Sequence, residues 1–90
     1  MDISYIRYLG SKNNIKDIHQ IDKEIVLEFK SIENISLELL KELSDQYGRR
    51  LTFDLSKEPA FKFRWKDNIL DELKSLVEKI NSFNHTKNNI

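Results

Sequence analysis

The strongest constraint on the fold of this chain is a change in the spacing of its apolar residues after position 65. Two segments, 51–55 and 61–65, carry a large apolar residue at every second position, whereas from 69 to 83 apolar residues recur at every third or fourth position. A period of two is typical of a strand with one buried face, and a period of 3.6 is typical of an amphipathic helix. The alternating residues are Leu51, Phe53, Leu55, Phe61, Phe63 and Trp65. The sequence therefore predicts a β-hairpin followed by a helix.

The first half of the chain shows a similar order of patterns. Residues 3–9 have helical spacing before Gly10, strands are predicted at 18–21 and 25–29, and Ser36 is a good N-cap for a second helix. The predicted order of elements is thus α-β-β-α-β-β-α. We expect an α+β fold in which antiparallel β-hairpins pack against helices in a single small domain. Whether the two hairpins join into one sheet stays open at this point.

Length and composition agree with one small folded domain. A chain of 90 residues with 39% hydrophobic and 33% charged residues can bury a modest core beneath a well-solvated surface. We place the domain at residues 1–83 and expect the polar tail, residues 84–90, to be disordered. The absence of cysteine excludes disulfides and thiolate metal sites. With no secretory signal and no apolar run long enough to span a membrane, the expected location is cytoplasmic.

The inventory of reactive residues argues against catalysis. His19 and His85 fall on separate predicted elements, and neither has an Asp or Glu at metal-ligand spacing, so both are interpreted as ordinary surface residues. The chain has only two glycines, which excludes a glycine-rich phosphate loop. We therefore predict no catalytic residue, no cofactor, no metal site and no small-molecule substrate, and we expect that the chain is not an enzyme.

The best candidate for a functional surface is a basic cluster around the second hairpin. If its strands pair, Arg50, Lys62 and Arg64 should share the solvent side of the sheet, opposite the aromatic side chains. Such a surface could bind an acidic protein or a phosphate backbone. It could also be a charged edge that discourages aggregation, and the pattern alone favours this second interpretation. The predicted interaction surface consists of Arg49, Arg50, Lys62, Arg64 and Lys66.

Two further observations bear on this surface. The strict alternation of Phe61, Phe63 and Trp65 favours a core role beneath the helices over a role in stacking on bases. Fifteen basic residues balance fifteen acidic ones, and a chain built to hold nucleic acid is usually distinctly basic. Nucleic acid is therefore the weaker of the two partner classes.

The order and spacing of these elements resemble the far C-terminal part of bacterial transcription-repair coupling factors. The resemblance covers residues 5–80 and includes the helix end at Leu9-Gly10, the strand 25–29 and the helix that ends at Tyr47-Gly48. This chain departs from the family pattern because residues 11–14 separate Gly10 from the next apolar residue. The upstream half of the family's C-terminal domain is also missing, so we expect the chain to be a fragment.

The resemblance implies a specific role. Coupling factors are ATP-driven DNA translocases with a helicase-type motor, which displace stalled RNA polymerase and recruit nucleotide excision repair. Their C-terminal domain packs on the N-terminal region of the same protein and restrains it. The chain would then be a non-catalytic regulatory module in DNA repair, with that N-terminal region as its partner and with no membrane contact. The alternative is a small nucleic-acid-binding domain that uses the basic face of its sheet.

Overall fold

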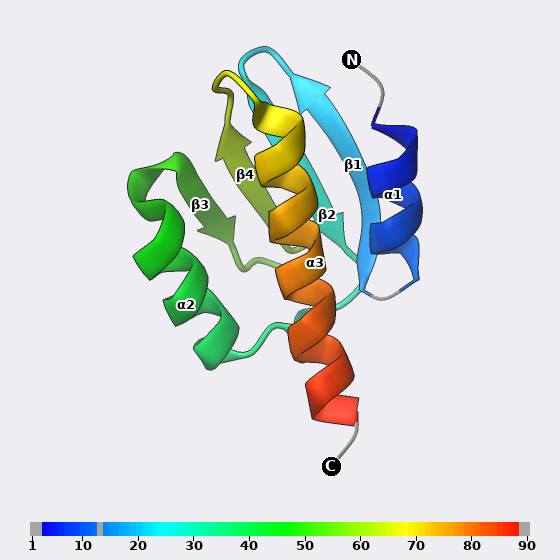
Figure 1. The fold of residues 1–90 in the computed structure, drawn as a ribbon. Coiled ribbons are helices and arrows are strands. Elements are labelled where there is room, and N and C mark those ends of the chain that lie inside the picture. Colours follow the sequence, from blue (N-terminus) through cyan, green and yellow to red (C-terminus); the bar gives the residue numbers. More distant parts are fainter. Residues whose placement is uncertain (1–2, 13, 89–90) are drawn as a thin grey trace.

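The computed structural model describes residues 3–12 and 14–88, and it confirms the order α-β-β-α-β-β-α (Figure 1). Two short 3-10 turns, η1 (Ile32–Asn34) and η2 (Gly48–Arg50), precede α2 and β3 respectively. The principal elements are α1 (Ser4–Ser11), β1 (Ile15–Ile21), β2 (Glu24–Phe29), α2 (Leu37–Tyr47), β3 (Leu51–Asp54), β4 (Ala60–Arg64) and α3 (Ile69–Asn88). The fold is therefore the predicted small α+β arrangement.

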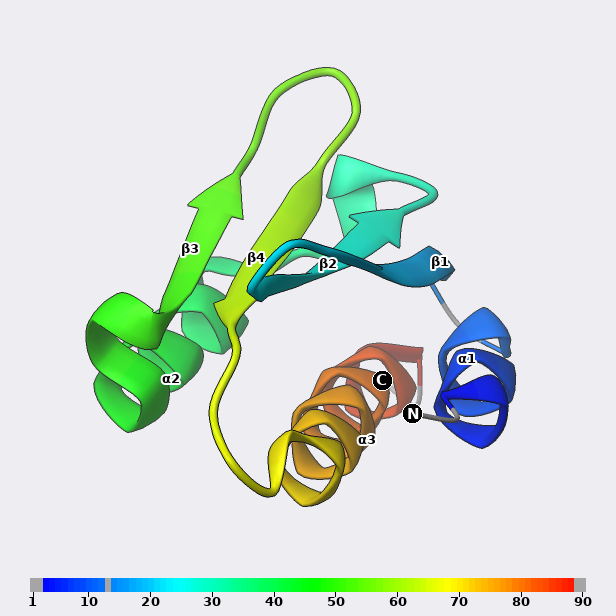
Figure 2. The same ribbon diagram turned by 90° about the horizontal axis from the view of Figure 1, so that it is seen from above.

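The two hairpins form one four-stranded antiparallel sheet, which answers the question that the sequence left open. The strand order is β1-β2-β4-β3, so the hairpins meet through β2 and β4. Leu27 of β2 pairs with Phe61 of β4 at the centre of this junction. All three α-helices lie on one side of the sheet, with α3 between α1 and α2 (Figure 2). The opposite side of the sheet therefore carries no α-helix within the part of the chain that the structure describes.

The core lies between the sheet and the helices, as the alternation predicts. Phe61 and Phe63 are fully buried, and the Phe61 ring lies 4.4 Å from Phe29 and 4.7 Å from Phe53 between centroids. Burying one such side chain contributes about 1.5–3 kcal/mol. The helix α3 adds the predicted apolar stripe, of which Leu73, Leu76, Val77 and Ile80 are fully buried.

Trp65 corrects one prediction about the aromatic residues. Its side chain is 37% exposed, because β4 ends at Arg64 and the chain turns away toward α3. Leu55 is exposed for the same reason, since β3 ends at Asp54. In the sequence, the alternation of apolar and polar residues thus continues one residue past the end of each strand. Beyond the strand it no longer determines which side chains are buried.

The other helix boundaries follow local chemistry. Ser36 caps α2 as predicted, because its Oγ accepts a hydrogen bond from the Leu39 amide at 3.1 Å. The helix α3 continues to Asn88, so the backbone of 84–88 is helical where the sequence predicts a disordered tail. No glycine or proline follows Phe83 to stop the helix, and propagation adds one hydrogen bond per residue. Residues 89–90 lie outside the described part of the chain.

Candidate functional site: the open face of the sheet and its Trp65 corner

The side of the sheet without helices, here called the open face, carries the outward residues of all four strands. Strand pairing aligns them in rows, such as His19 beside Val26 and Val26 beside Lys62. Adjacent rows hold Glu24 beside Arg64 and Asp17 beside Glu28. The outward residues are Asp17, His19, Ile21, Glu24, Val26, Glu28, Thr52, Asp54, Ala60, Lys62 and Arg64. The face is therefore mostly polar and contains both signs of charge.

Lys62 and Arg64 lie on the open face, as the strand alternation predicts. Both side chains are exposed. Neither makes an ion pair with another of the described residues, since the ion pairs there involve other cations. These two charges are thus available to a partner.

Arg50 does not lie on the open face, and this part of the prediction is wrong. Its guanidinium contacts the helix side of the sheet, where Nη1 and Nη2 donate to the Glu72 carboxylate at 2.7 and 2.9 Å. The same group stacks over the Phe63 ring at 4.8 Å from the centroid. The reason is local: Arg50 belongs to the 3-10 turn η2, so the alternation of β3 begins only at Leu51.

The pair between Arg50 and Glu72 is structural. Arg50 joins η2 to the first turn of α3, and its Nη2 also donates to the Arg64 carbonyl at 3.3 Å. The hydrogen bond from Arg50 lowers the pKa of Glu72, and the same bond raises the pKa of Arg50. Burial raises the pKa of the adjacent Tyr47 hydroxyl, with the Glu72 charge as a second cause. Arg50 is therefore held by its own chain.

Arg49 and Lys66 are exposed, but they flank the sheet and do not belong to its strands. Arg49 lies in η2, and Lys66 follows β4 in the connection to α3. The charge of Lys66 contributes to the lowered pKa of Glu72, which places Lys66 near the start of α3. Of the five basic residues predicted as one surface, the structure brings only Lys62 and Arg64 together on the open face.

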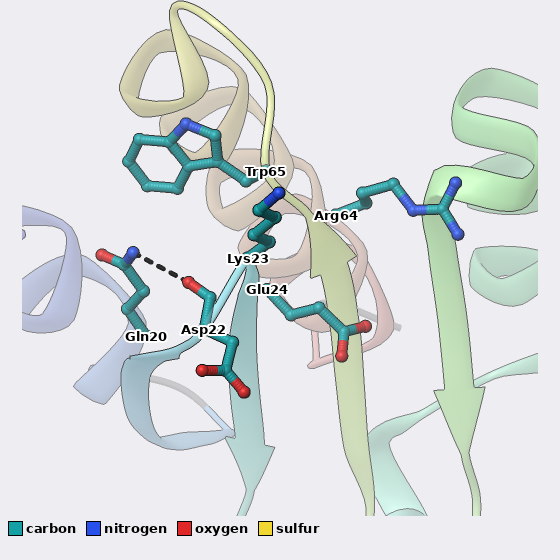
Figure 3. Close-up of a pocket in the computed structure, with 6 residues that line it drawn as sticks. All are labelled: Gln20, Asp22, Lys23, Glu24, Arg64 and Trp65. Carbon is teal, nitrogen blue, oxygen red and sulfur yellow. Dashed lines mark hydrogen bonds between the residues drawn. The ribbon is translucent and has the colours of Figure 1, made fainter.

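A hollow that the sequence did not reveal adjoins the open face, and we call it the Trp65 corner (Figure 3). It forms where the β1–β2 turn meets the end of β4, and the Trp65 amide donates to the Lys23 carbonyl at 2.7 Å. Asp22 makes the turn tight with a φ of 54°. The lining residues are Gln20, Asp22, Lys23, Glu24, Arg64 and Trp65. Pairing of β2 with β4, which no local pattern shows, brings these segments together.

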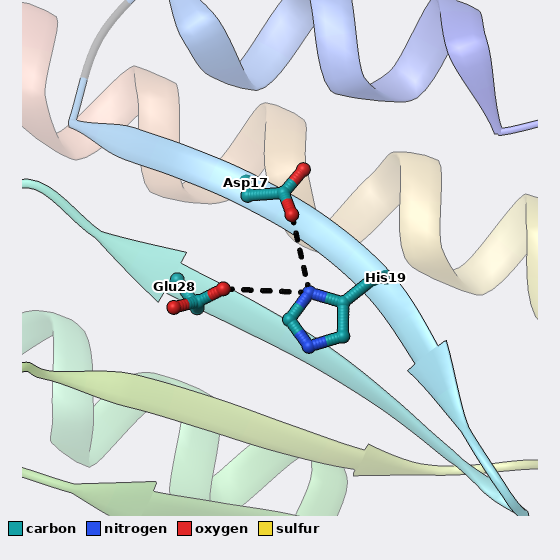
Figure 4. A group of neighbouring side chains, drawn as sticks. All are labelled: Asp17, His19 and Glu28. Atoms are coloured by element: carbon teal, nitrogen blue, oxygen red, sulfur yellow. Dashed lines mark hydrogen bonds and ion pairs between the residues drawn. The ribbon is translucent and has the colours of Figure 1, made fainter.

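A second missed feature is a cluster around His19 (Figure 4). Its Nδ1 lies 3.2 Å from Asp17 Oδ2 and 3.4 Å from Glu28 Oε1. The expectation that no carboxylate stands at metal-ligand spacing from His19 is therefore wrong. The strand β1 begins at Ile15 and not at 18, so Asp17 shares a face with His19, and strand pairing supplies Glu28.

Comparison with family models, with curated proteins and with solved structures finds no significant match to this chain. Among the described residues, no helix has an apolar stretch that could cross a membrane. The resemblance to coupling factors stays a prediction from the order and spacing of the elements.

Proposed function

We propose that this chain is a non-catalytic protein-docking module whose contact surface is the Trp65 corner, with Arg64 as its main charged contact. The observation that supports this most directly is Trp65, a large aromatic residue that is 37% exposed. It lines the same hollow as Arg64, whose guanidinium points away from the indole and has no ion-pair partner among the described residues (Figure 3). Tryptophan and arginine are the residue types that most often dominate the energy of protein–protein interfaces.

The charges of this surface favour a protein over a nucleic acid. The open face presents Lys62 and Arg64, but these cations stand among four carboxylates. The carboxylates are Asp17, Glu24, Glu28 and Asp54. A phosphate backbone laid across the strands would therefore meet more negative than positive side chains, which opposes the electrostatic attraction that nucleic-acid binding needs.

The Trp65 corner suits a segment that carries both an apolar anchor and mixed charges. Lys23 and Arg64 can pair with acidic groups of a partner, while Asp22 and Glu24 can pair with basic ones. The narrower form of the proposal follows the resemblance to coupling factors. In that form the partner is the N-terminal region of the same protein, docking is reversible, and release exposes the surface that recruits repair proteins. This role would place the module in the cytoplasm, where bacterial transcription and repair take place.

Because Trp65 is the only tryptophan in the chain, its fluorescence reports directly on the proposed surface. We expect that titration with the N-terminal region of a coupling factor shifts the Trp65 emission to shorter wavelength as the indole loses contact with water. Arg64→Glu should weaken this binding at least about tenfold, since a buried charged contact contributes roughly 2 kcal/mol or more. Lys41→Glu, on the exposed side of α2, is the matched control and should bind as the wild type does.

Three outcomes would contradict parts of the proposal. Equal affinities for the wild type and Arg64→Glu would refute the surface. No binding of the N-terminal region would refute the narrower form. Binding of duplex DNA that weakens steeply with added salt, and that Lys62→Glu abolishes, would favour the nucleic-acid alternative instead.

A further inference from the structure

We propose that Asp17, His19 and Glu28 form a binding site for a divalent transition-metal ion of the zinc class on the open face of the sheet. One imidazole nitrogen and two carboxylates converge there, and their ligand atoms all lie within 4.8 Å of one another (Figure 4). Imidazole and carboxylate are ligands that such ions bind together.

Strand geometry holds the three side chains on one face. Asp17 and His19 are two residues apart on β1 and so point the same way, while Glu28 lies directly opposite Asp17 on β2. Ligands on a paired strand backbone start from nearly fixed positions, so little conformational freedom is lost when they bind an ion. The site therefore needs no rearrangement of the fold.

The distances match those of a tetrahedral ion. Zinc–nitrogen and zinc–oxygen bonds of about 2.0–2.2 Å place two tetrahedral ligand atoms about 3.3–3.6 Å apart. The Nδ1 atom of His19 lies 3.2 Å from Asp17 Oδ2 and 3.4 Å from Glu28 Oε1. The third separation, between the carboxylates, is at most 4.8 Å. Rotation of the partly exposed Glu28 side chain can close it.

The contacts within the cluster also leave a place for a cation. The distances of 3.2 and 3.4 Å from His19 Nδ1 to the two carboxylates are longer than the 2.7–2.9 Å typical of charge-assisted hydrogen bonds. A divalent ion at the centre would contact all three groups. Among the described residues, the side chain that brings a permanent positive charge to the cluster is Arg7, whose Nε lies 3.6 Å from Asp17 Oδ1.

Arg7 lies on the outer side of the cluster. Its Nε is 3.6 Å from Asp17 Oδ1, which is too long for a hydrogen bond, and it donates its proton to the Ile18 carbonyl at 2.7 Å. The Arg7 charge thus stands beside Oδ1 and leaves Oδ2 directed at the imidazole. Three protein ligands leave one tetrahedral position for water, and the exposure of Asp17 and Glu28 gives the ion a path of entry.

The test titrates the intact chain with Zn²⁺ by calorimetry and with Co²⁺ by visible absorption, which is intense only for tetrahedral coordination. We expect one ion per chain, and at least about tenfold weaker binding for His19→Gln and for Glu28→Gln, since loss of even an outer partner of a metal ligand typically costs about 10–100-fold in affinity. The matched controls are Glu24→Gln, a carboxylate on the same face of β2, and His85→Gln, the other histidine of the sequence. Both should bind as the wild type does.

A second measurement distinguishes loss of a ligand from loss of the fold. Saturating Zn²⁺ should raise the thermal unfolding midpoint of the wild type and of Glu24→Gln, but not that of His19→Gln. Circular dichroism without metal should be the same for all variants. The proposal is overturned if His19→Gln binds Zn²⁺ as tightly as the wild type, if His85→Gln abolishes binding, or if the stoichiometry shows only adventitious ions.

Discussion

At the scale of single residues, Glu72 shows how a charge in this small domain becomes structural. Its carboxylate accepts hydrogen bonds from Nη1 and Nη2 of Arg50. This contact connects α3 to the turn η2, which directly precedes β3. Both side chains are about one-quarter exposed, at 25% for Arg50 and 29% for Glu72. The pair is thus less screened by water than an ordinary surface ion pair.

This pair predicts a specific pH dependence of stability. Because the pKa of Glu72 is lowered in the folded state, its contribution is present above the ordinary value of 4.5 and is lost as the pH falls through the lowered value. In urea unfolding, the difference in free energy between the wild type and Glu72→Gln should therefore shrink between about pH 6 and about pH 3. Glu78→Gln, an exposed site on the same helix, should retain the wild-type pH dependence. A difference that stays constant over this range would show that the pair does not stabilise the fold.

At the scale of secondary-structure elements, the boundary between α2 and β3 decides where the following side chains point. Gly48 has a φ of 56° and its amide donates to the Ser44 carbonyl, so it ends α2 and begins η2. The turn η2 sets the first residue of β3 at Leu51, which places Arg50 on the helix side. The position of this turn therefore keeps Arg50 outside the alternation of β3.

We expect Gly48→Ala to lower the free energy of unfolding by about 1–3 kcal/mol through backbone strain. No described atom lies within 4 Å of an added Cβ, so a steric clash does not contribute. Chemical denaturation followed by circular dichroism measures the change. Ser44→Ala, one turn earlier on the exposed side of α2, is the control and should stay within about 0.5 kcal/mol of the wild type. An equal effect of the two substitutions would refute the role of the angle.

At the scale of the whole molecule, the junction of β2 with β4 makes one domain of two hairpins. Phe61 stands at this junction, where it pairs with Leu27 on one side and Phe53 on the other. Its ring also contacts the rings of Phe29 and Phe53. The core of the domain is therefore continuous across both hairpins.

Removing this ring should affect the whole domain. Phe61→Ala is expected to lose about 3–5 kcal/mol, which for a domain of this size lowers the thermal midpoint by at least roughly 12 °C. Lys62→Ala, the next residue on the opposite face, should leave the midpoint nearly unchanged. Differential scanning calorimetry should show one transition for each variant. Separate transitions for the two hairpins would contradict a shared core.

The sequence by itself determined the elements and which of their faces are buried. The alternation in β3 and β4 and the helical spacing in α3 predict the buried positions Leu51, Phe61 and Phe63, because each is set by the period of the backbone. In this hairpin the alternation is wrong just outside the strands, at Leu55 and Trp65, which follow β3 and β4, and at Arg50, which precedes β3. Periodicity does not report the burial of Asn14, which lies in the turn before β1 but is 3% exposed, with its side chain exchanging two hydrogen bonds with Ser31.

Only the tertiary structure decided which elements meet. The Trp65 corner depends on β2 pairing with β4, and the cluster at His19 depends on the pairing of Asp17 with Glu28. The ion pair between Arg50 and Glu72 depends on the first turn of α3 lying beside η2. Residues far apart in the chain come together through strand order and register, which depend on the packing of the entire core. A periodic pattern reports the surroundings of one segment at a time, so it predicts burial well and proximity between segments poorly.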